Sequence, residues 1–165
     1  MLDSINIEEV KSENLIKNVD VRLACVEDGL ENIGFRKFAA YVQSVHPNTK
    51  IAYVPTGNWR GFIRIMSERG AGNLTQNDIN EIAKFLGKGD VIGLSSMTQY
   101  SSTVRDIISS IRKINPKAYI VWGGIHPIIQ PEDAIKYADA VCTGEGEFAF
   151  KTFLELYPPH TQSNF

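Results

Sequence analysis

The stretch from Val121 to Glu147, VWGGIHPIIQPEDAIKYADAVCTGEGE, decides how the rest of the chain is interpreted. It begins in the apolar run Ala118–Trp122, which breaks at Gly123-Gly124. A second short apolar run, residues 139–143, stops at Gly144-Glu-Gly-Glu147. Two buried-strand signals therefore each end in a glycine-rich turn. In an open parallel sheet, both turns would lie at the carboxyl edge of the strands, where such folds hold their ligands.

Short apolar runs alternate with helical patterns along the whole chain. Each apolar run is apolar on both faces, as parallel strands covered by helices must be. With right-handed crossovers, this pattern predicts an α/β fold with a doubly wound, five-stranded parallel sheet of order 2-1-3-4-5, a flavodoxin-like (Rossmann-like) arrangement. The predicted strands are 21–26, 51–54, 91–94, 118–122 and 140–143, and the predicted helices are 33–45, 62–66, 79–86, 102–114, a short one from about 131, and 147–156.

Length and composition limit the classes of protein that the chain can represent. At 165 residues, one domain over residues 20–157 is expected, with a leader at 1–19 and a disordered tail at 158–165. The net charge of -2 argues against a nucleic-acid partner. No apolar run approaches the roughly 20 residues that span a bilayer, and the polar N-terminus is no secretory signal, so a cytoplasmic protein is predicted. The two cysteines are interpreted as buried hydrophobes, and no metal ligand or catalytic residue is predicted.

Four loops at the carboxyl ends of the predicted strands form the candidate site. Glycines let a ligand approach the backbone, and hydroxyl groups can hydrogen-bond it. A turn or capping role explains any one of these residues, but together at one edge they favour a site. His126, beside Pro127, is interpreted first as packing the turn, and the acids before the last helix also as its caps. The candidate binding residues are Glu27, Asp28, Gly29, Glu31, Ser95, Ser96, Met97, Thr98, Gly123, Gly124, Ile125, His126, Thr143, Gly144, Glu145, Gly146 and Glu147.

Three classes of ligand use this edge in folds of the predicted type. A phospho-receiver needs an aspartate at the end of the third strand, where this chain has Leu94-Ser95. A flavin phosphate would be repelled by the acidic loop Glu27–Glu31. Cobalamin, whose nucleotide tail threads between sheet and helices, needs small residues after strands three and four. Ser95-Ser96 and Gly123-Gly124 occupy those positions and favour cobalamin.

The segments Gly123-Gly-Ile-His-Pro127, Pro131-Glu132, Asp139-Ala-Val141 and Gly144-Glu-Gly-Glu147 together resemble the N-terminal cobalamin-binding domain of class B radical SAM enzymes. Residues 33–41, IGFRKFAAY, resemble that family's first helix, and the resemblance covers residues 20–157. The family includes methyltransferases and the anaerobic magnesium-protoporphyrin ester cyclase. The resemblance implies a cobalamin-binding, flavodoxin-like fold. In complete members it also implies a downstream barrel with a [4Fe-4S] cluster and S-adenosylmethionine.

The chain departs from that family pattern in one way and from methionine-synthase-type domains in another. It has no Cys-x3-Cys-x2-Cys to hold an iron–sulfur cluster. The barrel is thus expected to be absent and the chain alone inactive; its partner would be its own C-terminal radical SAM domain. Methionine-synthase-type domains carry Asp-x-His-x-x-Gly, and anchoring on Gly34 places Glu31 at the histidine and Gly29 at the aspartate. Cobalamin is therefore expected base-off without a histidine ligand, with Glu31 one candidate to lie beneath the cobalt.

A different class of function stays open at the level of sequence. The chain could be a degenerate flavodoxin-like module that binds no cofactor and serves as an interaction or substrate-docking domain. The structural sign of that function would be a crevice at the strand switch point filled by Met97 or Trp122.

Overall fold

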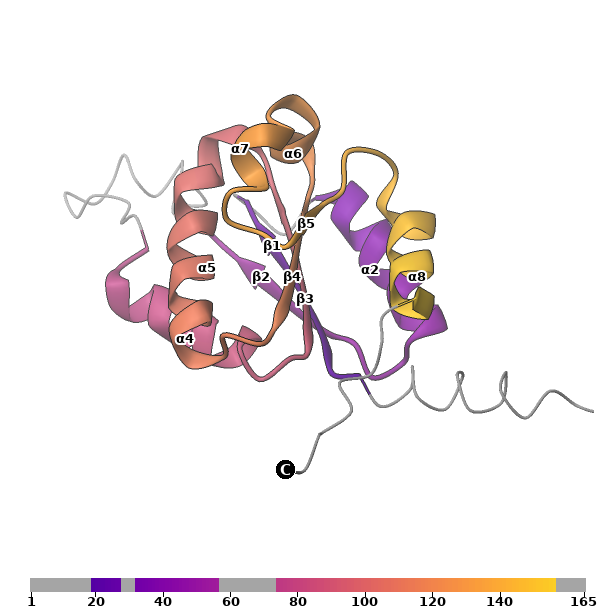
Figure 1. The fold of residues 1–165 in the computed structure, drawn as a ribbon, viewed down its shortest axis with the longest axis horizontal. Helices are drawn as coiled ribbons and strands as arrows, with labels where there is room; N and C mark the ends of the chain where they lie inside the picture. Colours follow the sequence, from indigo (N-terminus) through magenta and orange to yellow (C-terminus); the bar gives the residue numbers. More distant parts are fainter. Residues whose placement is uncertain (1–18, 28–31, 57–73, 157–165) are drawn as a thin grey trace, which may run out of the picture.

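Five parallel strands run through the middle of the fold in the computed structural model, which describes residues 19–27, 32–56 and 74–156 (Figure 1). The strands are β1 (Val21–Val26), β2 (Lys50–Val54), β3 (Val91–Ser96), β4 (Tyr119–Gly123) and β5 (Ala140–Val141). Their order in the sheet is β2-β1-β3-β4-β5, and every pairing is parallel. The predicted flavodoxin-like arrangement is confirmed, with its switch point between β1 and β3.

Helices cover both faces of the sheet (Figure 1). One face carries α2 (Ile33–Val45) and α8 (Gly146–Leu156), and the other carries α4 (Gln76–Leu86) and α5 (Ser101–Ile114). The short elements η1 (Thr98–Tyr100), α6 (Ile125–Ile129) and α7 (Pro131–Ala134) follow β3 and β4. Successive strand residues point to opposite faces. Leu23 and Cys25 therefore belong to the core beneath α2 and α8, whereas Ala24 and Val26 belong to the core beneath α4 and α5.

Capping side chains fix where the helices begin. Thr75 and Asp78 form a capping box, in which each side chain bonds the other residue's backbone N–H. This box starts α4 at Gln76, three residues before the predicted start at Ile79. Asn32 caps α2 by accepting a hydrogen bond from the backbone N–H of Phe35 at 2.7 Å.

Three predictions at the carboxyl edge were wrong in detail. Strand β5 was expected to continue to Thr143, but it ends at Val141. Strand β3 was expected to end at Leu94, but it continues to Ser96, so both serines lie in the strand. Residues 123–127 were expected to form a loop, but helix α6 begins at Ile125. The cause is Gly124, whose φ of 90° turns the chain directly from β4 into α6.

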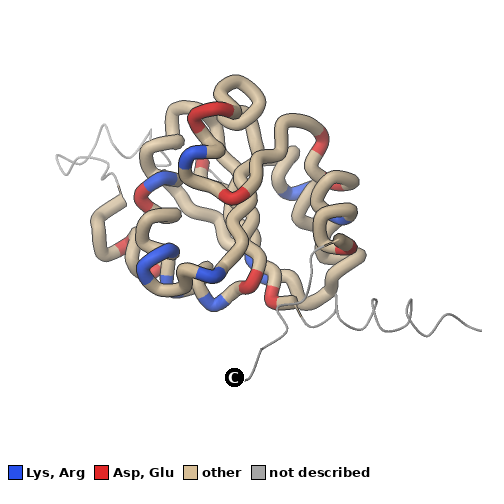
Figure 2. Tube along the Cα trace, viewed as in Figure 1, with Lys and Arg blue, Asp and Glu red and all other residues tan. Residues whose placement is uncertain are grey.

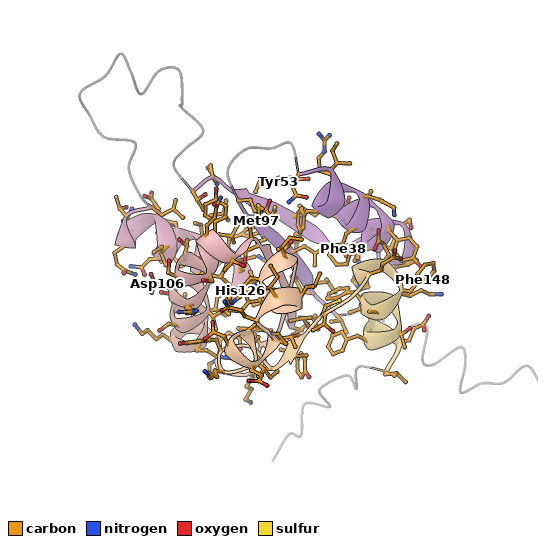
Figure 3. All side chains as sticks on the ribbon, turned by 90° about the horizontal axis from the view of Figure 1, so that it is seen from above. Phe38, Tyr53, Met97, Asp106, His126 and Phe148 are labelled. Atoms are coloured by element: carbon orange, nitrogen blue, oxygen red, sulfur yellow. The ribbon has the colours of Figure 1, made fainter. Side chains whose placement is uncertain are left out.

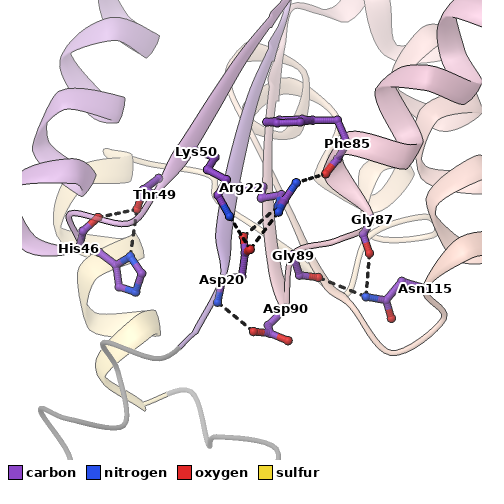
Figure 4. A network of polar contacts seen from close by, with 10 residues as sticks. All are labelled: Asp20, Arg22, His46, Thr49, Lys50, Phe85, Gly87, Gly89, Asp90 and Asn115. Atoms are coloured by element: carbon purple, nitrogen blue, oxygen red, sulfur yellow. Dashed lines mark hydrogen bonds and ion pairs between the residues drawn. The ribbon is translucent and has the colours of Figure 1, made fainter.

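The opposite edge of the sheet is held by polar contacts (Figure 4). Arg22 is buried; its Nε donates to Asp20 at 2.8 Å, another of its nitrogens donates to the backbone carbonyl of Phe85, and its guanidinium lies over the Phe85 ring. Lys50 bonds the same aspartate at 2.7 Å, and Asn115 donates to two carbonyls of the α4–β3 turn. Burial opposes ionisation of Asp20, but the hydrogen bond from Arg22 outweighs it and lowers the pKa of this carboxyl. These contacts tie β1, β2 and α4 together at the edge away from the glycine-rich turns.

Acidic and basic residues are interspersed along the described chain (Figure 2). Within the same residues, no helix has both the length and the apolar character needed to cross a membrane. The predicted leader, the predicted helix at 62–66 and the predicted tail fall outside the described residues, apart from Val19 at the leader's end.

Candidate functional site

A cavity of about 680 Å³ opens at the carboxyl edge between the sheet and helices α2 and α8. Its floor consists of the residues of β3, β4 and β5 that point towards these two helices. Its opposite wall is aromatic, with Phe35 and Phe38 from α2 and Phe150 and Phe153 from α8. The rings of Phe38 and Phe150 meet edge to face at 5.5 Å (Figure 3 shows Phe38 between the two helices). The cavity is therefore closed on one side by the contact between α2 and α8.

Small residues form the floor in two cross-strand rows. In the row nearer the edge, Ser95 pairs with Cys25 on one side and Gly123 on the other. In the next row, Gly93 pairs with Leu23 and Val121. A Cβ atom on Gly93 would stand 2.7 Å from Cδ2 of Leu23 and 3.5 Å from the Phe150 ring. A glycine inside a central strand leaves room for close approach; here Leu23 and Phe150 border that room, and Gly93 and Phe150 both line the cavity.

Gly124 allows the β4–α6 turn to lie directly on β3. A Cβ there would come within 2.7 Å of the backbone oxygen and 2.8 Å of the backbone nitrogen of Ser96. Its positive φ is also a conformation that residues with a side chain rarely adopt. Both reasons require glycine at this position, and the turn that it makes forms one wall of the cavity.

The turn from β5 into α8 forms another wall. A Cβ on Gly146 would lie 3.1 Å from the Phe38 ring, so this glycine brings α8 close to α2. Glu147, in the first turn of α8, pairs with Lys37 at 3.2 Å. The hydrogen bond from its own backbone N–H lowers the pKa of Glu147; burial opposes this effect, and Lys37 adds to the lowering. This geometry agrees with the predicted capping role of the acid.

Glu27 carries the carboxylate at the end of β1. It lines the cavity and accepts a hydrogen bond from the side-chain amide of Asn32, the residue that caps α2. Burial raises the pKa of Glu27, and the Asn32 bond opposes that rise. Asn32 thus joins the mouth of the cavity to the start of α2, a role that its sequence position did not suggest.

A model of the B12 binding domain matches residues 19–154. The chain belongs to the B12-binding domain family. A search of curated proteins finds no match. Among solved structures, the chain resembles a cobalamin-binding protein from Desulfitobacterium hafniense, with 15% identity, a TM-score of 0.51, and coverage of 85% of this chain and 60% of that one. It also resembles the N-terminal domain of a hypothetical protein from Thermotoga maritima, with 24% identity, a TM-score of 0.41, and coverage of 61% and 81%.

Most candidate residues of this B12-binding domain converge on the cavity. Asp28, Gly29 and Glu31 lie outside the described residues. Ser96, Met97, Thr98 and His126 are not among the lining residues. The candidates that do line the cavity are Glu27, Ser95, Gly123, Gly124, Ile125, Thr143, Gly144, Glu145, Gly146 and Glu147.

His126 lies on the other side of the sheet, fully buried against Trp122 with the ring centroids 4.8 Å apart (Figure 3). Its Nε2 is 3.3 Å from a carboxylate oxygen of Asp133, which is within ion-pair range but outside hydrogen-bond geometry. Arg105 of α5 pairs with the same carboxylate. Trp122 in turn donates from Nε1 to the hydroxyl of Ser96 at 3.0 Å. These contacts match the packing interpretation of His126 and show that Ser96 supports the wall of the cavity from behind.

The sequence did not single out the hydrophobic lining of the domain. Phe35 and Phe38 on α2, and Phe150 and Phe153 on α8, are each three residues apart, so each pair shares a helix face. Such pairs look like ordinary core residues in a sequence. The signal that could have revealed a cavity was Gly93, because a glycine in the apolar run Val91–Leu94 weakens a strand unless something approaches it.

Proposed function

We propose that this domain binds cobalamin, with the nucleotide tail of the cofactor inserted between the sheet and helices α2 and α8. The observation that carries the proposal is the cavity of about 680 Å³ floored by Gly93. Its volume lies within the range of small-molecule sites, and Gly93, Ser95 and Gly123 on its floor are small. Membership of the B12-binding family and the fold shared with a cobalamin-binding protein support the same ligand.

The residues present fit the different parts of such a ligand. Glycines at 123, 124, 144 and 146 give the rim a backbone surface on which a corrin ring can rest. Side chains of Glu27, Asn32 and Glu145 at the rim can accept or donate hydrogen bonds to the amide groups that surround a corrin. The apolar interior would take the base at the end of the tail. When bound, cobalamin supplies a cobalt centre able to carry a methyl group, and the domain supplies binding and orientation.

We also propose that cobalamin binds base-off, with no histidine under the cobalt. A tail inserted beside Gly93 cannot at the same time place its base beneath the metal. Within residues 19–27, 32–56 and 74–156, the histidines are His46 and His126, and neither lines the cavity. The paramagnetic resonance spectrum of the bound cob(II)alamin form tests this point. Nitrogen splitting of the cobalt lines would overturn it, because it would reveal a base or imidazole ligand.

Binding itself is tested with the full chain and hydroxocobalamin. After mixing and desalting, the protein should retain a corrin absorption band near one equivalent. Cobinamide, which lacks the nucleotide and its base, should be retained less because it leaves the cavity empty. If no cobalamin is retained at high micromolar ligand, the proposal fails.

A cofactor-free docking module is the competing function, and its structural sign is not met. Trp122 points into the core beneath α5, and Met97 is exposed and does not line the cavity. Neither side chain fills the space between the sheet and α2 and α8. The geometry therefore favours a domain that holds a ligand there.

The resemblance of Gly123–Pro127 and Gly144–Glu147 to class B radical SAM enzymes supports a wider proposal about the parent protein. In it, this domain would present cobalamin to its own C-terminal radical SAM barrel, which would hold a [4Fe-4S] cluster and S-adenosylmethionine. A methyltransferase is the reaction class we favour, with a cyclase as the second. Sequencing the gene beyond the codon for Phe165 tests this. A Cys-x3-Cys-x2-Cys within some tens of residues supports the proposal, and a gene without one contradicts it.

A further inference from the structure

The side chains that line the cavity change from polar to apolar with depth. Glu27, Asn32 and Lys37 belong to the mouth, where β1 ends and α2 begins. Ser95 lies in the floor row nearer that mouth, and its hydroxyl is the innermost polar side chain of β3. Two residues further from the edge, about 6–7 Å along the strands, the floor consists of Gly93, Val121 and Ala140.

Among the described residues that line the inner part of the cavity, no side chain offers a ligand a hydrogen-bonding partner. These side chains are aliphatic on the floor and aromatic on the wall, where Phe150 faces Gly93. The backbone of the central strands there is occupied as well: Gly93 pairs with strands on both sides, and Val121 pairs with Gly93 and with Ala140 of the edge strand. In such a ladder the N–H and C=O groups bond each other rather than a ligand. A polar atom that reaches this depth beside Gly93 therefore loses its hydrogen bonds to water and gains none from these residues.

We infer that the domain discriminates among cobamides by the base at the end of the nucleotide tail, and selects an apolar benzimidazole or phenol over a purine. This inference rests on the proposed insertion of the tail into the cavity. The six-membered ring of the base is the part farthest from the ribose, so it reaches deepest. In dimethylbenzimidazole that ring carries only carbon atoms and two methyl groups. In adenine it carries two ring nitrogens and an amino group.

The polar groups of adenine and the methyl groups of dimethylbenzimidazole set the size of the preference between the two bases. Each polar group of adenine left unpaired at this depth weakens binding by about tenfold. Each methyl group of dimethylbenzimidazole that is buried against the aromatic wall strengthens binding by about fourfold. Water that follows adenine into the cavity would satisfy some of its groups. The net expectation is a preference for cobalamin of at least about tenfold.

The test measures dissociation constants of the full chain for four corrinoids by titration calorimetry: cobalamin, adeninylcobamide, cresolylcobamide and cobinamide. We expect cobalamin and cresolylcobamide to bind with similar affinity, and adeninylcobamide to bind at least about tenfold more weakly. Equal affinity for cobalamin and adeninylcobamide overturns the inference and leaves the proposed function intact. Weak binding of both cresolylcobamide and adeninylcobamide also overturns it, because size rather than polarity would then decide. If none of the four binds, the proposed function fails and the inference fails with it.

A pair of matched variants tests whether the apolar interior of the cavity causes the preference for cobalamin. Val121→Thr keeps the shape of the side chain and places a hydroxyl group beside Gly93, so the preference for cobalamin over adeninylcobamide should shrink several-fold. Val91→Thr makes the same change on the same face of the sheet, at a buried residue that does not line the cavity, and should leave the preference unchanged. Because the ratio compares two ligands on one sample, a partly unfolded variant does not distort it. An unchanged ratio in Val121→Thr would overturn the inference.

Discussion

Gly93→Ala is the substitution that most directly tests how the cavity works. The added Cβ would stand 2.7 Å from Cδ2 of Leu23, so the end of this buried leucine must move. It would also lie 3.5 and 3.6 Å from two ring carbons of Phe150, which lines the cavity together with Gly93. Overpacking of this kind lowers the free energy of unfolding by about 1–2 kcal/mol. Alanine has less backbone entropy than glycine in the unfolded chain, and this difference raises the free energy of unfolding by about 0.5–1 kcal/mol. The free energy of unfolding should therefore fall by about 1 kcal/mol.

The effect of Gly93→Ala on binding should depend on the ligand. A cobalamin tail displaced by one methyl group should lose about 1.4 kcal/mol, which is a tenfold rise in dissociation constant. Cobinamide has no base to displace, so its dissociation constant should not change. Titration of both corrinoids into the variant and the wild type measures the two effects. Equal weakening of both ligands, or of neither, would refute the idea that the tail lies beside Gly93.

The control for this variant is Gly89→Ala, at the other edge of the sheet. A Cβ there would come 2.9 Å from Cγ of Arg22 and 3.2 Å from the backbone oxygen of Asp20, so a similar steric cost is expected. Gly89 does not line the cavity. Its substitution should lower the free energy of unfolding while leaving the affinities for cobalamin and cobinamide as they are. A loss of cobalamin affinity in this variant would mean that stability alone explains the Gly93 result.

Three further predictions concern single side chains. Gly124→Ala should lower the free energy of unfolding by about 2 kcal/mol or more in urea denaturation, because it combines a positive φ with a clash against β3; a neutral effect would contradict the geometry. Burial raises the pKa of Glu27, so its favourable contribution is complete below the unfolded value of 4.5 and is lost as pH rises through the folded value. The stability gained by Glu27→Gln, from urea titrations, should therefore grow between pH 4.5 and 7.5, and a constant or falling difference would contradict this. Asp20→Asn should cost about 2–3 kcal/mol at pH 7 because it leaves Arg22 buried without its carboxylate. The wild type should approach the variant as pH falls from the ordinary carboxyl pKa of 3.8 through the lowered pKa of Asp20. A cost that is the same at pH 7 and in acid would exclude the ion pair as its source.

The overall topology could be predicted because it follows from properties that a sequence records directly. Apolar runs separated by helical patterns require a covered parallel sheet, and the handedness of the crossovers limits the strand order. The glycine turns at 123–124 and 144–146 were correctly placed at the edge, since Gly123 is the last residue of β4 and Gly144 lies between β5 and α8.

The face of the sheet to which each side chain points could not be predicted in the same way. A strand alternates its side chains with a period of two, so the exact residue where it ends decides what reaches a site. Because β3 was expected to stop at Leu94, Ser95 and Ser96 were both assigned to the site. In the structure, Ser95 faces the cavity and Ser96 faces Trp122. His126 is a similar case, since its direction depends on helix α6, which the sequence pattern around Pro127 does not indicate.

The two faces of the sheet differ in how densely they are packed, and this difference predicts which helix opens first. Beneath α4 and α5 the core is filled by side chains such as Trp122, Ile107 and Ile120, which are fully buried. Beneath α8 the cavity takes part of the space. This helix packs through the buried residues Phe150 and Leu154 and through ring contacts such as Phe153 on Tyr119 at 5.1 Å. Backbone amides of α8 should therefore exchange with solvent through a local opening, well before those of α5, which require global unfolding. A ligand that occupies the cavity should therefore slow the exchange of the α8 amides selectively.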